Sequence, residues 1–507
     1  MRSLKWSGAL IAVVMLGCGS SSSGAGGGAP PPPPAPTGPR LAQGLTITGV
    51  AVFQGTKADV VAPDASGTPV HVDAPKAPVV AGRIGQLRVY VAPDATWTPH
   101  EVTAELHVFD ATGKEQPVTF SSATPSGPST DDAFATTFNF LLEDANIVPA
   151  GGTYRVAIVD KQSGVAVKDG DTSTARWPND GTTDSFGAKS NGDAFHLQLV
   201  PLSYDADGSG RLPVLTDQQL QLYTDSLFKL YPVAKIDLQV HAPLPWKTKI
   251  DGAGAGWDEA MQAMSDLKAT EKAPDNVWYV AAFEPNDQFD VYCANGCILG
   301  LGTLDGGNDP LQRTSAIVGY SGAVATDTLP QELAHTLGRL HAPCGNPSGL
   351  DTRYPYPLGR IGSWGYNVLT RELIDPGSKY RDYLSYCSPI WTSDYSFAAM
   401  FKGIAHANKV TLTRETSLSE PRNYHFVTVR PDGSLKWGRT ITRTSSPDGE
   451  ERAVTFHAAD GRVLSNAVGY FSPYSNLGGG LLQVPEGPAT FASMRVHSHA
   501  TVTTLAR

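Results

Sequence analysis

Positive charge and long apolar runs are both scarce in this sequence of 507 residues. Lys and Arg total 39 against 49 Asp and Glu, which gives a net charge of -10, and the basic residues form no stripe. A nucleic-acid-binding surface needs such a stripe to neutralise phosphates, so the composition argues against a nucleic-acid partner. Beyond residue 16 no stretch is long and apolar enough to form a transmembrane helix.

Turn-forming residues are abundant instead. The chain contains 52 Gly and 39 Pro, a composition typical of β-rich architecture with many turns. Its length is too great for one ordinary domain and indicates about three.

The N-terminus has the pattern of an export signal. Arg2 and Lys5 precede an apolar run, Ala9 to Leu16, that is too short to span a bilayer. The run ends in Met15-Leu16-Gly17-Cys18, which resembles the lipobox of bacterial lipoproteins. That resemblance implies a signal peptide over residues 1–18, lipidation of Cys18 and an exported protein anchored in the cell envelope, at the outer membrane or cell surface. The alternative is a plain secretory signal with an incidental cysteine.

Three further regions follow the Gly-, Ser- and Pro-rich tether of residues 19–44. Residues 45–200 alternate apolar and polar residues at period two between turns, which predicts a β-sandwich. Residues 201–405 mix helical and strand patterns, and residues 406–507 return to period two, with turns at 431–433, 447–449 and 460–461. We therefore expect a multidomain α+β protein in which an α+β domain lies between two β domains.

Within residues 201–405, local patterns predict two helices and three strands. Thr216 and Gln219 form the Ser/Thr-x-x-Glu/Gln pattern of a capping box, followed by apolar residues at helical spacing. The expected elements are helices at 216–230 and 257–267, and strands at 236–240, 277–283 and 298–302.

A group of chemically active side chains lies between residues 331 and 341. Its sequence is Gln331-Glu-Leu-Ala-His335-Thr-Leu-Gly338-Arg-Leu-His341, with Glu332 beside the glutamine. Residues four apart lie on one face of a helix, and a glycine can end that helix in a left-handed turn. The metzincin family, whose signature this string resembles, has such a turn, and the resemblance implies that His341 turns back toward His335. The alternative is that both histidines are ordinary core residues.

This string resembles the metzincin signature H-E-x-x-H-x-x-G-x-x-H. The resemblance implies that His335 and His341 bind Zn²⁺, that Glu332 is the general base and that Gly338 permits the turn. Gln331 stands where the first histidine ligand belongs, and a neutral amide is a poor zinc ligand. Gln331 is either a weak third ligand or the last residue of a capping box that begins at Thr328, with Pro330 in the first turn.

A second segment, Asp382-Tyr-Leu384-Ser-Tyr386-Cys387, resembles the Met-turn beneath the zinc of metzincins. Leu384 replaces the methionine, a swap of similar volume. Tyr386 matches a tyrosine that in some metzincin families stabilises the oxyanion. Upstream, Ile298 to Gly302 takes the place of the edge strand that binds substrate by β-augmentation.

Four cysteines remain after Cys18: Cys293, Cys297, Cys344 and Cys387. An even number in an exported protein predicts two disulfides, but the sequence leaves the pairing open, and a four-cysteine zinc site is the alternative. The metzincin resemblance implies a Cys344–Cys387 bond that ties the third-ligand loop to the Met-turn. The other pair, Cys293–Cys297, would then stiffen the entry to the edge strand.

Together these resemblances imply a zinc-dependent endopeptidase acting on protein or glycoprotein substrates at the cell surface. The flanking β domains resemble those of large secreted bacterial metzincins that cut glycoproteins. The alternative function is a pseudoprotease that keeps the groove as a surface binding protein without turnover. In both cases the only membrane contact expected is through the N-terminal lipid.

The lipid anchor can be tested directly. Cys18→Ser removes the acceptor sulfur, so we expect the variant to leave the membrane fraction or to remain unprocessed, as measured by fractionation and immunoblotting. Wild-type protein that is soluble and cleaved at another position would contradict the lipoprotein interpretation.

Overall fold

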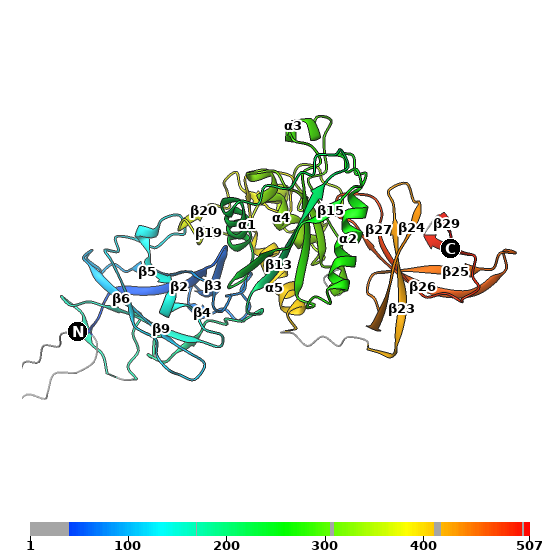
Figure 1. Ribbon diagram of the computed structural model, residues 1–507. Coiled ribbons are helices and arrows are strands. Elements are labelled where there is room, and N and C mark those ends of the chain that lie inside the picture. Colours follow the sequence, from blue (N-terminus) through cyan, green and yellow to red (C-terminus); the bar gives the residue numbers. More distant parts are fainter. Residues whose placement is uncertain (1–39, 169, 305–308, 410–416, 499–500) are drawn as a thin grey trace, which may run out of the picture. The chain divides into compact units, whose positions relative to one another are not determined.

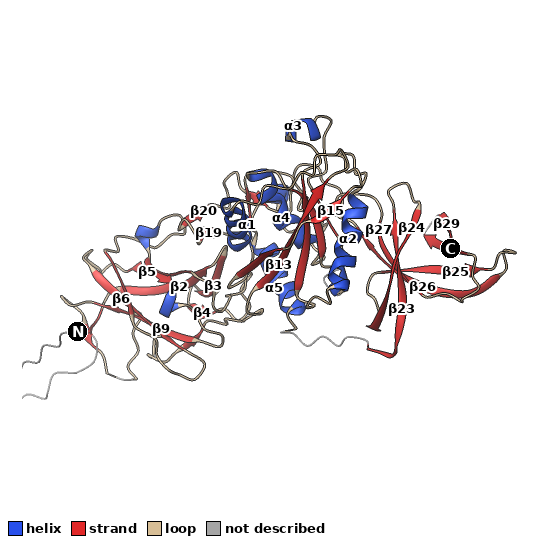
Figure 2. Cartoon of the chain, viewed as in Figure 1, coloured by secondary structure: helices blue, strands red, loops and turns tan. Residues whose placement is uncertain are grey.

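The computed structural model describes residues 40–168, 170–304, 309–409, 417–498 and 501–507 (Figures 1 and 2). Within these ranges the chain is β-rich and multidomain, with five α-helices. The expected signal peptide, the lipidation site Cys18 and most of the tether lie outside the described residues. No helix in the described ranges has the length and apolarity that crossing a membrane requires.

Residues 40–188 form two antiparallel sheets around one core, as the period-two pattern predicts. In β6 every second residue from Val102 to Val108 is buried. One sheet contains, in spatial order, β10 (Val165–Ala166), β1 (Arg40–Leu41), β9 (Thr153–Val159), β6 (Val102–Phe109) and β7 (Thr119–Ala123), with β11 (Arg176–Trp177) and β12 (Asp184–Ser185) also paired to β9. The other contains β4 (Pro69–His71), β3 (Lys57–Pro63), β2 (Leu45–Phe53), β5 (Gly85–Pro93) and β8 (Phe138–Leu142).

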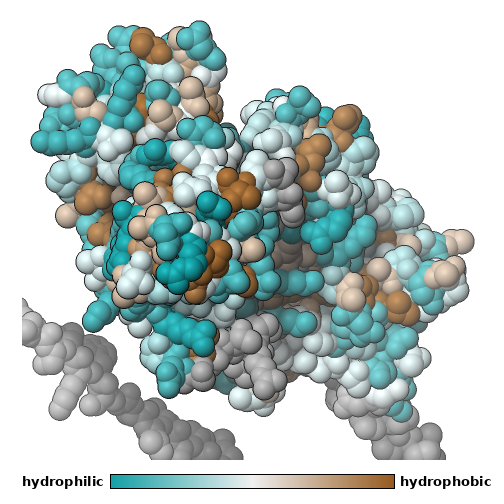
Figure 3. Space-filling model, turned by 90° about the vertical axis from the view of Figure 1, so that its right-hand side faces the viewer, coloured by the Kyte–Doolittle hydropathy of each residue, from teal (hydrophilic) through white to brown (hydrophobic). Residues whose placement is uncertain are grey.

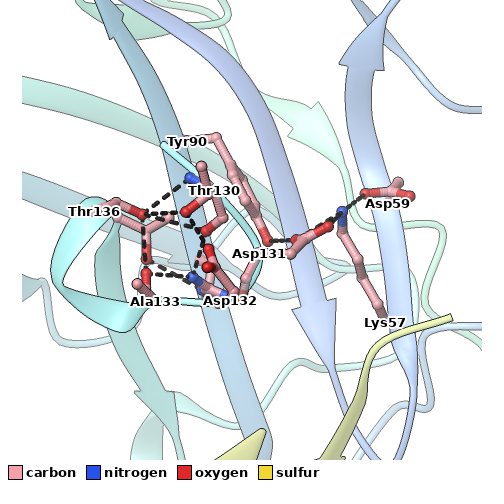
Figure 4. A network of polar contacts seen from close by, with 10 residues as sticks. Lys57, Asp59, Tyr90, Thr130, Asp131, Asp132, Ala133 and Thr136 are labelled. Carbon is pink, nitrogen blue, oxygen red and sulfur yellow. Dashed lines mark hydrogen bonds and ion pairs between the residues drawn. The ribbon is translucent and has the colours of Figure 1, made fainter. Parts of the chain in front are cut away.

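A polar network holds the loop between β7 and β8 onto this sandwich. Arg88 of β5 is fully buried and donates hydrogen bonds to three backbone carbonyls of the loop. Figure 4 shows Asp131 of the loop between Tyr90, whose hydroxyl donates to it at 2.6 Å, and Lys57, which forms an ion pair with it at 3.0 Å. Because these groups find their partners within the chain, the network anchors the loop.

The central sheet mixes parallel and antiparallel strands and carries helices on both faces. Its order is β14 (Ile236–Val240), β13 (Phe195–Tyr204), β16 (Val277–Phe283), β18 (Thr314–Val318) and β17 (Gly300–Gly302), and β15 (Leu244–Trp246) continues beside β13. All pairings are parallel except that of β17, which is the antiparallel edge strand. β13 begins at Phe195, before the expected boundary at residue 200, because a period-two pattern does not tell to which sheet a strand belongs.

Helices α1 (Asp217–Leu230), α4 (Ala323–His335) and α5 (Asp394–Ala407) share one core with this sheet, and α2 (Trp257–Thr270) shares another. In β16 the side chains alternate between the two cores, so the strand is buried on both faces. The remaining small elements are α3 (Phe289–Tyr292), β19 (Gly365–Asn367), β20 (Glu372–Ile374), β21 (Arg381–Asp382) and β22 (Ile390–Trp391).

Both predicted capping boxes differ from the structure. Thr216 does cap α1 by accepting from the Gln219 N–H, but the Gln219 side chain accepts from Gly322 N–H at the start of α4 instead of closing the box. The second box is wrong: α4 begins at Ala323, so Thr328 lies inside the helix and donates to a carbonyl four residues back. The local Thr-x-x-Gln signal does not include the apolar residues that extend α4 upstream.

Seven antiparallel strands form the C-terminal sheet, and the predicted turns at 431–433, 447–449 and 460–461 connect four of them. In spatial order these are β24 (Leu435–Ser445), β23 (Ser417–Val429), β27 (Gly480–Pro485), β26 (Val463–Pro473), β25 (Glu450–His457), β28 (Ser493–Ser498) and β29 (Thr501–Ala506). On the face shown in Figure 3, hydrophobic residues form small separate groups among hydrophilic ones.

One buried cation lies in α2. Lys268 is 1% exposed, and its ammonium donates to the backbone carbonyl of Val277. Burial lowers the pKa of Lys268 to about 7.

Lys268 should therefore make stability depend on pH. Between its folded pKa of about 7 and an unfolded value of about 10.4, the unfolded chain binds more protons than the folded protein. The unfolding free energy of the wild type should thus rise with pH relative to Lys268→Met, by roughly 2.6 kcal/mol between pH 6 and pH 9. Urea unfolding of both proteins at several pH values measures this difference, and a difference independent of pH would contradict the assignment.

Candidate functional site

Helix α4 and the turn after it bring the two predicted histidine ligands together. α4 carries Gln331, Glu332 and His335 and ends at His335. Gly338 follows in the left-handed region, with φ of +73°, as the predicted turn requires. The chain then returns, and the rings of His335 and His341 lie 4.5 Å apart, centroid to centroid.

The hydrogen bonds of both imidazoles fix their tautomers. Nδ1 of His335 lies 2.6 Å from the carbonyl oxygen of Arg339, and Nδ1 of His341 lies 2.6 Å from that of Ser348. Because a carbonyl only accepts, each Nδ1 carries the proton and each Nε2 keeps its lone pair. Both Nε2 atoms are buried and have no hydrogen-bond partner.

Burial also keeps these rings neutral. It is the largest cause that lowers the pKa of His335, to about 3, and the nearby His341 lowers it further. Burial also lowers the pKa of His341, against the raising effects of its hydrogen bond to Ser348 and of the Asn476 side chain. Two neutral rings with free Nε2 atoms and Nδ1–H groups bound to carbonyls form a donor set that fits a transition-metal ion such as Zn²⁺.

Glu332 of α4 is 1% exposed, and its side chain contacts the connection between β26 and β27 of the C-terminal sheet. One carboxylate oxygen accepts from the Ser475 hydroxyl at 3.0 Å, and the other accepts from the Asn476 amide at 2.9 Å. Burial raises the pKa of Glu332 to about 8, although both hydrogen bonds oppose the shift. A carboxyl group with a pKa near neutrality is suited to general acid–base chemistry.

The edge strand β17 packs directly on α4, at Glu332. A Cβ atom added to Gly300 would lie 2.4 Å from the Glu332 Cγ. One added to Gly302 would lie 2.5 Å from the Glu332 carbonyl oxygen and 3.1 Å from the His335 Cβ. Only glycine fits at these two positions, so the edge strand lies against the helix that carries the chemical groups.

Gln331 lies one helical turn before His335 and is half-buried. It is not the end of a capping box, because α4 begins eight residues earlier, at Ala323. Within the described part of the chain its side chain makes no hydrogen bond, and no group of three or more His, Cys, Asp or Glu residues is arranged to hold a metal ion. Ligation by Gln331 remains a prediction.

The segment resembling a Met-turn lies next to His341. Leu384 is buried in the core shared with α4, and its carbonyl accepts from Ala342 N–H at 3.1 Å. The Tyr386 ring lies 5.0 Å from that of His341, and its hydroxyl donates to the Asn476 side-chain oxygen at 2.7 Å. Tyr386 is 48% exposed, so it borders the site instead of lying in the core.

Both disulfides form as expected. Cys344 and Cys387 are bonded, with Cα atoms 5.7 Å apart, and this bond ties the segment after His341 to the segment after Tyr386. Cys293 and Cys297 are bonded with Cα atoms 4.9 Å apart, just before β17.

Sequence reasoning missed Ser475 and Asn476. They lie in the connection between β26 and β27, more than 130 positions from Glu332 in the sequence. A Ser-Asn pair between two strands reads as an ordinary turn, so no local signal assigns it to the site.

Comparisons with known proteins leave the family open. No protein-family model and no curated protein matches the sequence. Among solved structures, a putative β-galactosidase from Bacteroides fragilis matches at 12% identity and a TM-score of 0.15, over 49% of this chain and 37% of that one. A β-glucuronidase from Parabacteroides merdae matches at 9% identity and a TM-score of 0.14, over 49% and 30%. The chain thus spans about a third of their length, and likeness this weak supports neither a fold nor a function.

The packing of β17 on α4 leads to a stability prediction. We expect Gly302→Ala to lower the unfolding free energy by roughly 1–3 kcal/mol, because its methyl group meets the Glu332 carbonyl and the His335 Cβ. Gly127→Ala is the matched control, since no atom lies within 4 Å of its added Cβ. Thermal or urea unfolding measures both, and equal effects of the two changes would contradict the close packing.

Proposed function

We propose that this chain is a metal-dependent peptidase of the metzincin type, with His335 and His341 as the metal-binding imidazoles. The observation that carries the proposal is the pair of buried Nε2 atoms without partners, each on a ring whose Nδ1–H is donated to a carbonyl. A buried nitrogen lone pair without a partner is costly, and a shared Zn²⁺ would satisfy both.

Gln331, one helical turn before His335, is the proposed third ligand. Its amide oxygen is a weaker donor than the imidazole that the metzincin pattern has there. Weak zinc binding is the expected consequence. When bound, zinc supplies Lewis-acid polarisation of a carbonyl oxygen and lowers the pKa of a coordinated water.

Other side chains at this site have acid–base and hydrogen-bonding roles in the proposal. In its ionised form Glu332 would accept a proton from the attacking water and pass it to the leaving amine. Tyr386 offers a hydroxyl donor for a developing oxyanion, and its pKa, raised to about 12 by burial and by Glu332, keeps that proton in place.

The proposed substrates are proteins or glycoproteins, held in extended form along β17, and the proposed location is the bacterial cell envelope through a lipid on Cys18. An edge strand offers backbone donors and acceptors to an extended peptide, which supports a polypeptide substrate.

A second function, a binding protein without turnover, is favoured by Gln331 itself. Replacing one of three ligands weakens metal binding by several kcal/mol, so the chain would bind polypeptides along β17 without the metal. Zinc content separates the two functions.

The test restores the missing ligand. Gln331→His should raise zinc affinity by about one order of magnitude or more, equivalent to at least about 1.4 kcal/mol, as measured by competition with a chelating dye and by elemental analysis. The same change should create or increase peptidase activity. Adding Glu332→Ala should abolish that gain while zinc stays bound, because it removes the base and no ligand.

Gln221→His on the exposed side of α1 is the matched control and should leave zinc affinity unchanged. A Gln331→His protein that binds no zinc would contradict the metal site and leave binding as the function. Wild-type protein with stoichiometric zinc and strong proteolysis dependent on Glu332 would show that Gln331 is an adequate ligand.

A further inference from the structure

The edge of β17 that does not pair with β18 is occupied by another part of the same chain. One edge of β17 pairs with β18, and the other lies beside residues 473–477, the tip segment between β26 and β27. Leu304 N–H donates to the Pro473 carbonyl at 2.8 Å, and Ser475 N–H donates to the Gly302 carbonyl at 2.9 Å. The Thr303–Tyr474 bridge between them is antiparallel. The tip segment therefore pairs with the strand edge as an added peptide strand would.

Side chains of the tip segment also form hydrogen bonds with the polar groups of the site. Besides its bond to Glu332, the Ser475 hydroxyl accepts from Gly302 N–H at 3.0 Å. The Asn476 amide donates to Glu332 and to the Gly300 carbonyl at 3.1 Å, and its oxygen accepts from Tyr386. Both residues with proposed acid–base or oxyanion roles are thus bound by one asparagine.

Apolar contacts complete the fit. Tyr474 is 4% exposed within the core that includes α2, and Leu477 packs against the same core. Gly254 leaves the space for Leu477, since an added Cβ there would lie 2.6 Å from the Leu477 Cδ1 and 3.3 Å from the Ile298 Cδ1. The site thus accepts an aliphatic side chain two positions after the serine that contacts Glu332.

Ion pairs connect the C-terminal sheet, to which the strands that carry the tip segment belong, with α2 and with the segment before β18. Arg430, the residue after β23, pairs with Asp258 at 3.3 Å and with Glu259 at 3.0 Å. The buried Arg443 of β24 pairs with Asp309 at 2.7 Å. A segment tethered in this way has an effective concentration of about the millimolar range or above, so it outcompetes dilute peptides.

We propose that residues 474–477 are a built-in pseudosubstrate that keeps the peptide-binding edge occupied and the site latent. The ligand class that the edge accepts is an extended polypeptide with a small polar pair followed by an aliphatic residue, as in Ser475-Asn476-Leu477. The claim that the site is latent rests on the proposed peptidase function, whereas the claim that the edge binds a polypeptide segment does not.

The test removes the side chains of the tip segment that contact the site and then adds the segment as a separate peptide. The open-tip variant is Ser475→Gly, Asn476→Gly and Leu477→Gly, and the probe is a synthetic peptide with the sequence of residues 472–479, Ser-Pro-Tyr-Ser-Asn-Leu-Gly-Gly. We expect the open-tip variant to bind this peptide at least about tenfold tighter than the wild type, by isothermal titration calorimetry. A probe with glycine at the asparagine and leucine positions should lose that affinity.

Hydrogen exchange gives a readout that needs neither metal nor turnover. The amides of Gly302 and Leu304 are protected by the tip segment, so they should exchange faster in the open-tip variant and slow again when the probe is added. The matched control is Ala459→Gly, Asp460→Gly and Arg462→Gly at the exposed β25–β26 turn. It should behave as the wild type in both measurements.

Each outcome has one meaning. Binding of the probe by the open-tip variant, with higher zinc-dependent hydrolysis than the wild type, supports the pseudosubstrate and the peptidase together. Probe binding without hydrolysis in any variant, Gln331→His included, supports the occupied edge and overturns the peptidase. No probe binding with unchanged exchange, or measurable hydrolysis at the same rate in wild type and open-tip variant, overturns the pseudosubstrate. Asn476→Ala, a milder change, repeats the measurements if the triple variant fails to fold by circular dichroism.

Discussion

A carboxyl group buried as completely as that of Glu332 must be hydrogen-bonded, protonated or beside a cation. Here the partners come from Ser475 and Asn476, and the second of these also binds Tyr386 and the Gly300 carbonyl. One carboxylate, that of Glu332 on α4, therefore lies where β17, the segment with Tyr386 and the C-terminal sheet meet. The desolvation of Glu332 is the constraint on which this arrangement depends.

The edge of β17 gives a second reason why the C-terminal sheet contacts the site. An unpaired strand edge exposes backbone donors and acceptors and invites pairing with any extended chain. β17 is short and rich in glycine, so it offers little side-chain cover of its own. The connection between β26 and β27 supplies hydrogen-bond partners both to the edge of β17 and to the buried Glu332 carboxylate. The same contacts that stabilise the fold therefore also cover the proposed peptide-binding edge.

Local sequence patterns predicted much of the fold and part of the candidate site. The alternation in β2, β5 and β9, the helical spacing in α1 and α2, and the i, i+4 spacing of Gln331 and His335 all depend on neighbours in sequence. The positive φ at Gly338 and the Cys344–Cys387 bond also agree with expectation. The periods and the turn could be predicted because neighbouring residues decide them, whereas the Cys344–Cys387 pairing was implied only by the metzincin resemblance.

Features decided by distant packing could not be predicted. Thr328 matched a capping pattern, yet α4 starts five residues earlier because Ala325 and the residues around it pack in the core beneath the sheet. The first strand of the central sheet continued the sandwich pattern without a break at Phe195. Ser475 and Asn476 carried no local mark, since their importance arises only where the C-terminal sheet reaches α4.

The Cys344–Cys387 bond has a consequence for the order in which the protein matures. It closes a loop with a sequence separation of 43, for which chain-entropy estimates give about 4 kcal/mol of stabilisation. A reduced chain in the cytoplasm lacks this tie between the segments after His341 and Tyr386. The segments after His341 and Tyr386 are therefore held together more firmly in an oxidising compartment than in a reducing one.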